Sequence, residues 1–150
     1  MGLAAACVVA NVIGQPMLMG LKAQVLIPGL ADLLPAWNRG ISFGLMAQDS
    51  QAGRALLIGF LSVIAAVVAI LAWRAITTLT AAGYGLILGG AIANLIDRIR
   101  FEGAVFDFLS LHLGRLPLFV CNLPDIFISA GFVLLVLDMM LAKPEAANAP

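Results

Sequence analysis

Two aspartates, Asp107 and Asp125, lie beside long apolar stretches of the chain, where they could act as a pair. Asp107 follows a strand-like run and has apolar neighbours on both sides, and Asp125 stands at the start of the last apolar stretch. Two carboxylates brought close together cannot both ionise easily, so one holds a proton while the other stays basic. The ionised partner can then activate a water, and the protonated partner can donate to the developing oxyanion. The pair therefore suits peptide hydrolysis, although a transporter or channel can use membrane aspartates equally well.

Polar residues recur along one face of the third apolar stretch. Gly90, Asn94 and Arg98 are spaced four residues apart, which places them on one side of a helix. Polar and ionisable groups at membrane depth are costly, so this row is a candidate site. The structural alternative is that Asn94 and Arg98 only bind backbone carbonyls or extend toward the lipid headgroups.

Asp125 also has an ordinary structural explanation. The segment Asn122–Asp125 is typical of a helix start, because Pro124 fits the first turn and a carboxylate there is favoured by the helix dipole. Asp125 could thus be only an N-terminal charge. Its place on the same membrane face as Asp107 is what favours the pair.

Other reactive residue types offer weaker sites. His112 is the only histidine and has no metal-ligand partners at a suitable spacing, so we expect no metal there and an interfacial or surface position. Ser42 has no base nearby in the sequence, and a serine mechanism would require His112 to come from the other long loop. Cys7 and Cys121 lie in apolar surroundings without metal or disulfide spacing, and we expect both to be small buried hydrophobic residues.

The composition is that of a membrane protein. Of 150 residues, 63% are hydrophobic and 11% are charged, against about 25% charged residues in soluble domains. The eight basic and eight acidic residues cancel, so no net charge favours binding to nucleic acid.

Four apolar stretches are long enough to cross a membrane, which takes about 20 residues. They run over residues 2–21, 55–73, 81–98 and 124–142, followed by a polar tail at 143–150 that we expect to be disordered. The first contains Asn11, Gln15 and Pro16, so we expect a kinked helix whose amides face the protein interior. In the third, threonines between positions 77 and 80 predict a short turn, with the helix starting near Ala81. Its Gly85, Gly89 and Ala93 form a line of small residues that lets another helix approach closely.

Two long connections lie on one membrane face, because the second and third spans are joined by only a few residues. Residues 25–44 combine prolines and glycines with alternating apolar residues, and residues 103–113 are similar, so both predict short strands. The expected fold is an all-α membrane protein with four transmembrane helices and a small β-containing platform built by the two loops. Six of the eight basic residues belong to this face, which the positive-inside rule would place in the cytoplasm.

Four ordered blocks make the sequence specific enough for comparison with a known family. These blocks are residues 38–44, 89–98, 103–108 and 122–125, and they include both aspartates and the row on the third span. In this order they resemble the motifs of lipoprotein signal peptidase, also called signal peptidase II. The resemblance covers roughly residues 25–140.

The resemblance implies an aspartyl endopeptidase without a cofactor, acting as a single membrane-embedded domain over residues 1–150. Such enzymes remove signal peptides from bacterial prolipoproteins just before the lipid-modified cysteine. The expected partners are therefore prolipoproteins and membrane lipids, with no nucleic acid, and the expected state is a monomer. The family lies in the inner membrane with both termini in the cytoplasm and a periplasmic platform. This topology opposes the charge count, and we follow the family because Arg98 lies inside a matched block.

The resemblance also suggests roles for individual residues. Asp107 and Asp125 match the catalytic pair. The surrounding positions that shape the site or bind substrate are matched by Asn38, Gly40, Asn94, Arg98 and Asn122.

The chain departs from the family pattern in its first helix. Asn11 and Gln15 stand where an aspartate and a lysine are usual, and these amides, one turn apart, could bond each other. Pro124 replaces the usual alanine, and Glu102 is an additional residue. The departures leave open a catalytically weakened relative that binds lipidated segments. The membrane aspartates leave open a second alternative, a small proton-coupled membrane carrier.

Overall fold

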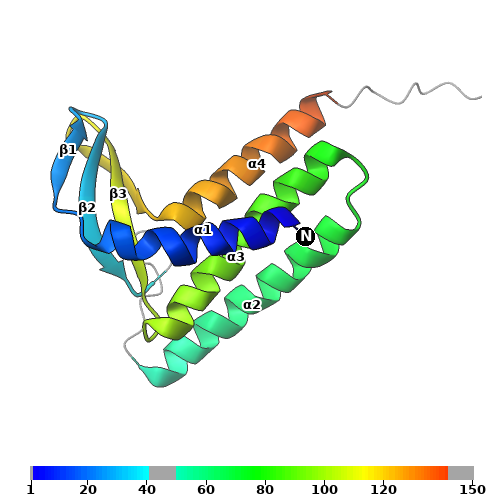
Figure 1. Ribbon diagram of the computed structural model, residues 1–150, viewed down its shortest axis with the longest axis horizontal. Coiled ribbons are helices and arrows are strands. Elements are labelled where there is room, and N and C mark those ends of the chain that lie inside the picture. Colours follow the sequence, from blue (N-terminus) through cyan, green and yellow to red (C-terminus); the bar gives the residue numbers. More distant parts are fainter. Residues whose placement is uncertain (1, 41–49, 142–150) are drawn as a thin grey trace, which may run out of the picture.

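The computed structural model describes residues 2–40 and 50–141, so Ser42 and the tail at 143–150 lie outside the described residues. Within these residues there are four helices and four strands, and each pair of strands lies between two helices in the sequence (Figure 1). In chain order they are α1 (Gly2–Met19), β1 (Gln24–Ile27), β2 (Ala31–Asn38), α2 (Gln51–Trp73), α3 (Thr78–Arg100), β3 (Val105–Leu113), β4 (Leu116–Cys121) and α4 (Leu123–Leu141). All four helices are long and apolar enough to cross a membrane, which confirms the expected fold class.

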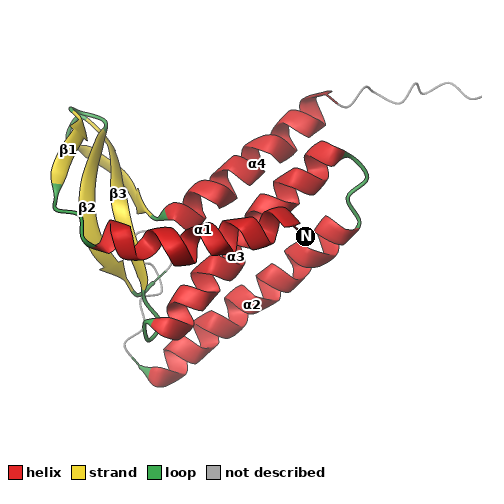
Figure 2. Ribbon diagram, in the orientation of Figure 1, coloured by secondary structure: helices red, strands yellow, loops and turns green. Residues whose placement is uncertain are grey.

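The two long loops build one antiparallel sheet with the strand order β1-β2-β3-β4. Figure 2 shows this sheet at one end of the helices. The first loop supplies β1 and β2, and the second supplies β3 and β4. The strand β4 was not predicted, since the expected extended region ended at residue 113. It forms because the chain reverses at Gly114 (φ 60°) and pairs back onto β3.

Two helices begin earlier than the apolar stretches suggest. α2 starts at Gln51 and not near residue 55, because the Ser50 hydroxyl accepts a hydrogen bond from the Gly53 N–H at 3.0 Å. α3 starts at Thr78 and not near Ala81, because the Thr77 hydroxyl accepts the Thr80 N–H at 2.9 Å. The threonines that predicted a turn therefore cap the helix.

The helix α3 is the centre of the bundle and packs against α1, α2 and α4. Its predicted line of small residues does permit close approach. A Cβ added at Gly89 would lie 2.6 Å from the Cys7 Cβ on α1. Gly90, which is outside that line, allows a second close approach, because a Cβ added there would lie 2.5 Å from the Pro124 carbonyl oxygen on α4. Gly90 therefore sets how near the first turn of α4, which carries Asp125, comes to α3.

Substituting Gly90 with alanine should separate α3 from α4. Overpacking of this kind costs on the order of 1–3 kcal/mol, so Gly90→Ala should lower the unfolding temperature in detergent. The matched control is Gly59→Ala on α2, where an added Cβ has nothing within 4 Å. The control should keep or slightly raise the unfolding temperature, because alanine favours a helix over glycine. Equal unfolding temperatures for the two variants would show that the close approach at Gly90 is unimportant.

Candidate active site

Asp125 is held by both its own helix and α3. Its backbone N–H donates to the Asn122 side-chain oxygen at 2.9 Å, and the Asn122 N–H donates back to Asp125 Oδ2 at 3.2 Å. This reciprocal pair is a capping box, so the structural explanation of Asp125 is correct as far as it goes. The other oxygen, Oδ1, accepts a hydrogen bond from Asn94 Nδ2 on α3 at 3.0 Å. A simple cap does not need this second contact, which fixes the carboxylate in space.

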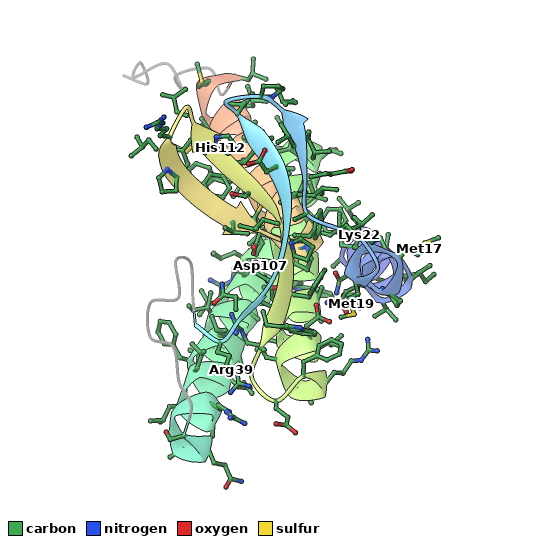
Figure 3. The ribbon with its side chains drawn as sticks, turned by 90° about the vertical axis from the view of Figure 1, so that its left-hand side faces the viewer. Met17, Met19, Lys22, Arg39, Asp107 and His112 are labelled. Atoms are coloured by element: carbon green, nitrogen blue, oxygen red, sulfur yellow. The ribbon has the colours of Figure 1, made fainter. Side chains whose placement is uncertain are left out.

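Asp107 lies in the buried half of β3 and is only 3% exposed. Its Oδ2 accepts from Asn38 Nδ2 at 3.0 Å, and its Oδ1 accepts from Asn122 Nδ2 at 2.9 Å. The Asn38 amide is oriented as a donor because its own oxygen accepts the Gly40 N–H at 2.9 Å. Figure 3 shows Asp107 where the sheet meets the helices.

Asn122 joins the two carboxylates into one network. Its backbone N–H binds Asp125, while its side-chain amide binds Asp107 and also donates to the Asn94 oxygen at 3.1 Å. The structure thus brings together both predicted aspartates and the three predicted asparagines. Each of the four carboxylate oxygens of Asp107 and Asp125 accepts one hydrogen bond.

Burial raises the pKa of Asp107 to about 6. This pKa is a net value: the hydrogen bonds from Asn38 and Asn122 and the charge of Arg98 lower it, and the nearby charge of Asp125 adds to the upward effect of burial. Asp107 can therefore carry its proton far closer to neutral pH than an ordinary aspartate. The neighbouring Cys121 stays a neutral thiol, because burial raises its pKa to about 11.

Arg98 is buried and binds backbone carbonyls, which is one of the two structural alternatives, and it does not extend to the headgroups. Its Nη1 donates to the Gly103 carbonyl at 2.8 Å and its Nη2 donates to the Gly40 carbonyl at 2.6 Å. The first carbonyl lies just before β3 and the second lies just after β2. One guanidinium therefore fastens both strands that carry Asn38 and Asp107 to the end of α3.

A cavity of about 300 Å³ opens beside this network. Asp125 lines it together with the predicted polar residues Asn38, Asn94, Arg98 and Asn122, and apolar side chains complete the wall. Asp107 does not line the cavity, and its oxygens are bonded to two residues that do. The apolar lining residues are Leu61, Ile64, Val68, Ile87, Ala91, Val105, Val120 and Ile128.

The sequence profile of a protein family described as Signal peptidase (SPase) II matches residues 4–141. This chain belongs to the signal peptidase II family. Its matches include a lipoprotein signal peptidase of Methylorubrum extorquens (strain PA1), 45% identical over 120 residues, which is 79% of this chain and 68% of that relative. A lipoprotein signal peptidase of Methylobacterium sp. (strain 4-46) is 38% identical over 145 residues, which is 94% of this chain and 87% of that relative.

A solved bacterial membrane enzyme shares the fold, with a TM-score of 0.70 at 18% identity, over 98% of this chain and 92% of that one. Family membership makes this chain a multi-pass membrane protease of lipoprotein processing.

This signal peptidase II chain departs from the family pattern at Asn11 and Gln15 in its first helix, and the structure shows what these two side chains bind. Asn11 Nδ2 and Gln15 Nε2 both donate to Asp97 Oδ2, at 3.0 and 2.6 Å, and all three side chains are buried. The two amides therefore meet on a third residue instead of bonding each other. The sequence motifs assign no role to Asp97. A signal was present, because an acid inside an apolar helix needs polar partners and α1 offers this pair four residues apart.

Asparagine should replace Asp97 without loss of stability. Among the described residues, Gln15 Oε1 and Asp97 Oδ1 have no hydrogen-bond partner. An asparagine at position 97 can still accept with its oxygen, and its N–H can donate to Gln15. Asp97→Asn should thus keep or raise the unfolding temperature in detergent, whereas Asp97→Leu should lower stability by on the order of 2 kcal/mol, because it strands two buried amides. Equal losses in the two variants would rule out this hydrogen-bonding role.

His112 is separate from the two carboxylates. Its Nδ1 lies 3.0 Å from the Gly114 carbonyl oxygen, and its Nε2 lies 3.1 Å from Asp32 Oδ2 on β2. Figure 3 shows His112 near one end of the sheet and Arg39 near the other, with Asp107 between them. The histidine therefore links two strands of the platform.

Proposed function

We propose that this chain is an aspartic endopeptidase that removes signal peptides from prolipoproteins, cutting just before the lipid-modified cysteine. It acts as a single membrane-embedded domain over residues 1–150, as a monomer in a bacterial inner membrane, with its active site toward the periplasm and no nucleic acid partner. The observation that carries the proposal is the network in which Asn122 binds Asp107 and Asp125 at once.

Asp125 is the base in the proposed reaction. It stands at the N-terminal end of α4, where the helix dipole favours a negative charge, and Asn94 holds it at the cavity wall. Its carboxylate takes a proton from a water as the water oxygen forms a bond to the scissile carbonyl carbon.

Asp107 is the acid. Because its pKa is about 6, it can donate its proton to the carbonyl oxygen as that oxygen becomes negative. When the C–N bond breaks, Asp125 returns its proton to the leaving amine and Asp107 recovers the proton from the collapsing intermediate. The products are a new carboxylic acid and a free amine, and no metal or cofactor takes part.

Substrate binding has to open the path to Asp107. In the described structure both of its oxygens accept amide hydrogen bonds from Asn38 and Asn122, which line the cavity. A substrate peptide group that displaces one of these amides reaches the acid directly. The three asparagines, Asn38, Asn94 and Asn122, would then bind the substrate backbone in place of the carboxylates. The contact between Arg98 and Gly40 would keep the strand ends in place.

The wall of the cavity suits an apolar peptide. Leu61, Ile64 and Val68 come from α2, and Ile87 and Ala91 from α3. These side chains supply contacts for the apolar residues that precede the cleavage site.

The cleavage rate should fall as the pH rises through about 6, the pKa of Asp107. Below this pH the acid is protonated and active. Above it the protonated fraction falls about tenfold for each pH unit. Initial rates measured across this range at constant ionic strength check the assignment. A rate that increases through the same range would mean that Asp107 acts in its ionised form.

The function itself is tested with purified protein and one prolipoprotein prepared with and without its diacylglyceryl group. The expected result is cleavage of the lipidated form before the modified cysteine, identified by mass spectrometry, and much slower cleavage of the unlipidated form. Binding of the lipidated form without cleavage would instead identify a non-catalytic relative. Proton flux in liposomes without substrate, lost on substitution of Asp107 or Asp125, would identify a carrier.

A further inference from the structure

A second cavity, of about 390 Å³, lies where β2 and α3 end. None of its lining residues lines the catalytic cavity. Trp37 and Asn38 are consecutive on β2, so their side chains leave opposite faces of the strand, with Asn38 directed at Asp107. We call this cavity the basic pocket. It is lined by Trp37, Arg39, Arg100, Phe101, Glu102 and Ala104.

The lining of the basic pocket combines guanidinium groups with aromatic rings. The Trp37 ring centre lies 5.1 Å from that of Phe101 and 5.4 Å from that of Phe106. The Trp37 side chain is nevertheless 52% exposed. The Arg100 guanidinium carbon lies 5.2 Å from the centre of the Phe101 ring. An anion with an apolar body fits such a surface, because guanidinium binds phosphate through paired N–H groups while the rings pack against carbon.

The described lining of the basic pocket holds two guanidinium groups and one carboxylate. Its acidic lining residue, Glu102, points a carboxylate oxygen to within 3.7 Å of Arg54 Nη1, outside the lining set. Arg39 and Arg100 are the two cations of this lining, and Arg100 lies at an exposed position.

The position of the basic pocket selects the source of the anion. It lies at the last turn of α3, a helix apolar enough to span the membrane, and therefore at the level where that helix leaves the bilayer. Tryptophan and arginine are the residues that proteins place at this level. The phosphate groups that surround a protein there belong to lipid headgroups.

We propose that the basic pocket binds the headgroup phosphate of an anionic phospholipid of the surrounding bilayer. Arg39 and Arg100 bind the phosphate, and Trp37 packs against the glycerol region. Arg39 lies between Asn38 and Gly40, which belong to the active site, so a bound headgroup steadies this end of β2. Lipid selectivity does not depend on the proposed peptidase activity, and the two are tested separately.

The test uses the fluorescence of Trp37. The chain has two tryptophans, so Trp73→Phe leaves Trp37 as the single reporter. This variant is reconstituted into phosphatidylcholine vesicles that contain equal mole fractions of brominated phosphatidylglycerol or brominated phosphatidylcholine. Brominated phosphatidylglycerol should quench Trp37 more strongly, with a relative binding constant raised about fivefold for each arginine.

Substitution of both arginines, Arg39→Gln with Arg100→Gln, should bring the two lipids to equal quenching. Arg100→Gln alone, at an exposed position, should lose about fivefold. Circular dichroism checks that the helices are retained. The matched control is Arg115→Gln, an exposed arginine in the turn between β3 and β4, which should keep the preference.

Three results would overturn the proposal. One is equal quenching by the two lipids in the parent, and another is a preference that survives both arginine substitutions. The third is loss of the preference on addition of inorganic phosphate, which would identify a site for free phosphate. None of these measurements involves cleavage, so a failure here leaves the proposed function untouched.

Discussion

Replacing Asp107 or Asp125 with asparagine should lower the cleavage rate by about 10³-fold or more, the scale set by loss of an acid–base group. Asparagine has nearly the same shape and retains one oxygen that can accept from Asn122 or Asn38, so the fold should survive. It can neither take a proton from water nor donate an acidic proton to the carbonyl oxygen. Initial rates on a lipidated prolipoprotein measure the loss, and unfolding temperatures show that it is not a loss of structure.

The double variant separates a catalytic pair from two independent aspartates. Groups that act as a unit have strongly non-additive effects, so Asp107→Asn with Asp125→Asn should be little slower than either single variant. The control is Asp138→Asn on α4, whose carboxylate binds Thr77 and Thr80 at the other end of the helix. Asp138→Asn should cleave at the parental rate. Substantial cleavage by either single variant at position 107 or 125 would remove that residue from the chemistry.

Arg98→Gln should be the next most damaging change, lowering the cleavage rate by on the order of 10²-fold, the cost of displacing catalytic groups by about 1 Å. The substitution leaves the Gly40 and Gly103 carbonyls without the guanidinium that joins them. Both glycines are buried, so the strand ends that position Asn38 and Asp107 should shift. The loss should appear in kcat more than in KM.

Arg98→Lys distinguishes positioning from charge. Lysine keeps the positive charge but cannot reproduce the fixed fork that reaches two carbonyls. Because the Arg98 charge lowers the pKa of Asp107, its removal in Arg98→Gln should move the fall in rate to higher pH. Arg98→Lys should be slow as well, but with the fall in rate near the parental pH. Parental activity in both variants would show that the two carbonyl contacts are dispensable.

Much of the fold was predictable because the membrane imposes simple rules. The length of the apolar stretches is enough to identify four spans. The two long loops had to lie on one membrane face, because two spans joined by a short turn separate them. Helix starts were less predictable, because Ser50 and Thr77 extend α2 and α3 through single capping bonds. The strand β4 was missed because its pairing depends on the turn at Gly114 and not on its own composition.

The candidate site was predictable as a set of residues and not as a set of contacts. The ordered blocks identified the two aspartates and their asparagines, because these residue types lie at fixed places on neighbouring elements. They could not show that Asn122 both caps α4 and binds the two carboxylates, since that depends on where β3 meets α4 in space. Asp97 was missed for the same reason, because its partners lie more than eighty residues away on α1.

The burial of Asp107 was also outside the reach of the sequence. An alternating strand with one wet face would expose every second residue, but four consecutive residues of β3, Val105–Phe108, are buried. Both faces of this part of the strand are covered. The pKa of Asp107 follows from that burial, and so does its expected role as the acid.

The central claim is that water, activated by two carboxylates, attacks the substrate directly. It is tested most directly by the mass of the signal peptide that the parental protein releases in the presence of hydroxylamine. Direct attack forms no covalent intermediate, so the peptide should end in a free carboxylate. A peptide ending in a hydroxamate would reveal an acyl-enzyme on a serine or cysteine and would contradict the account.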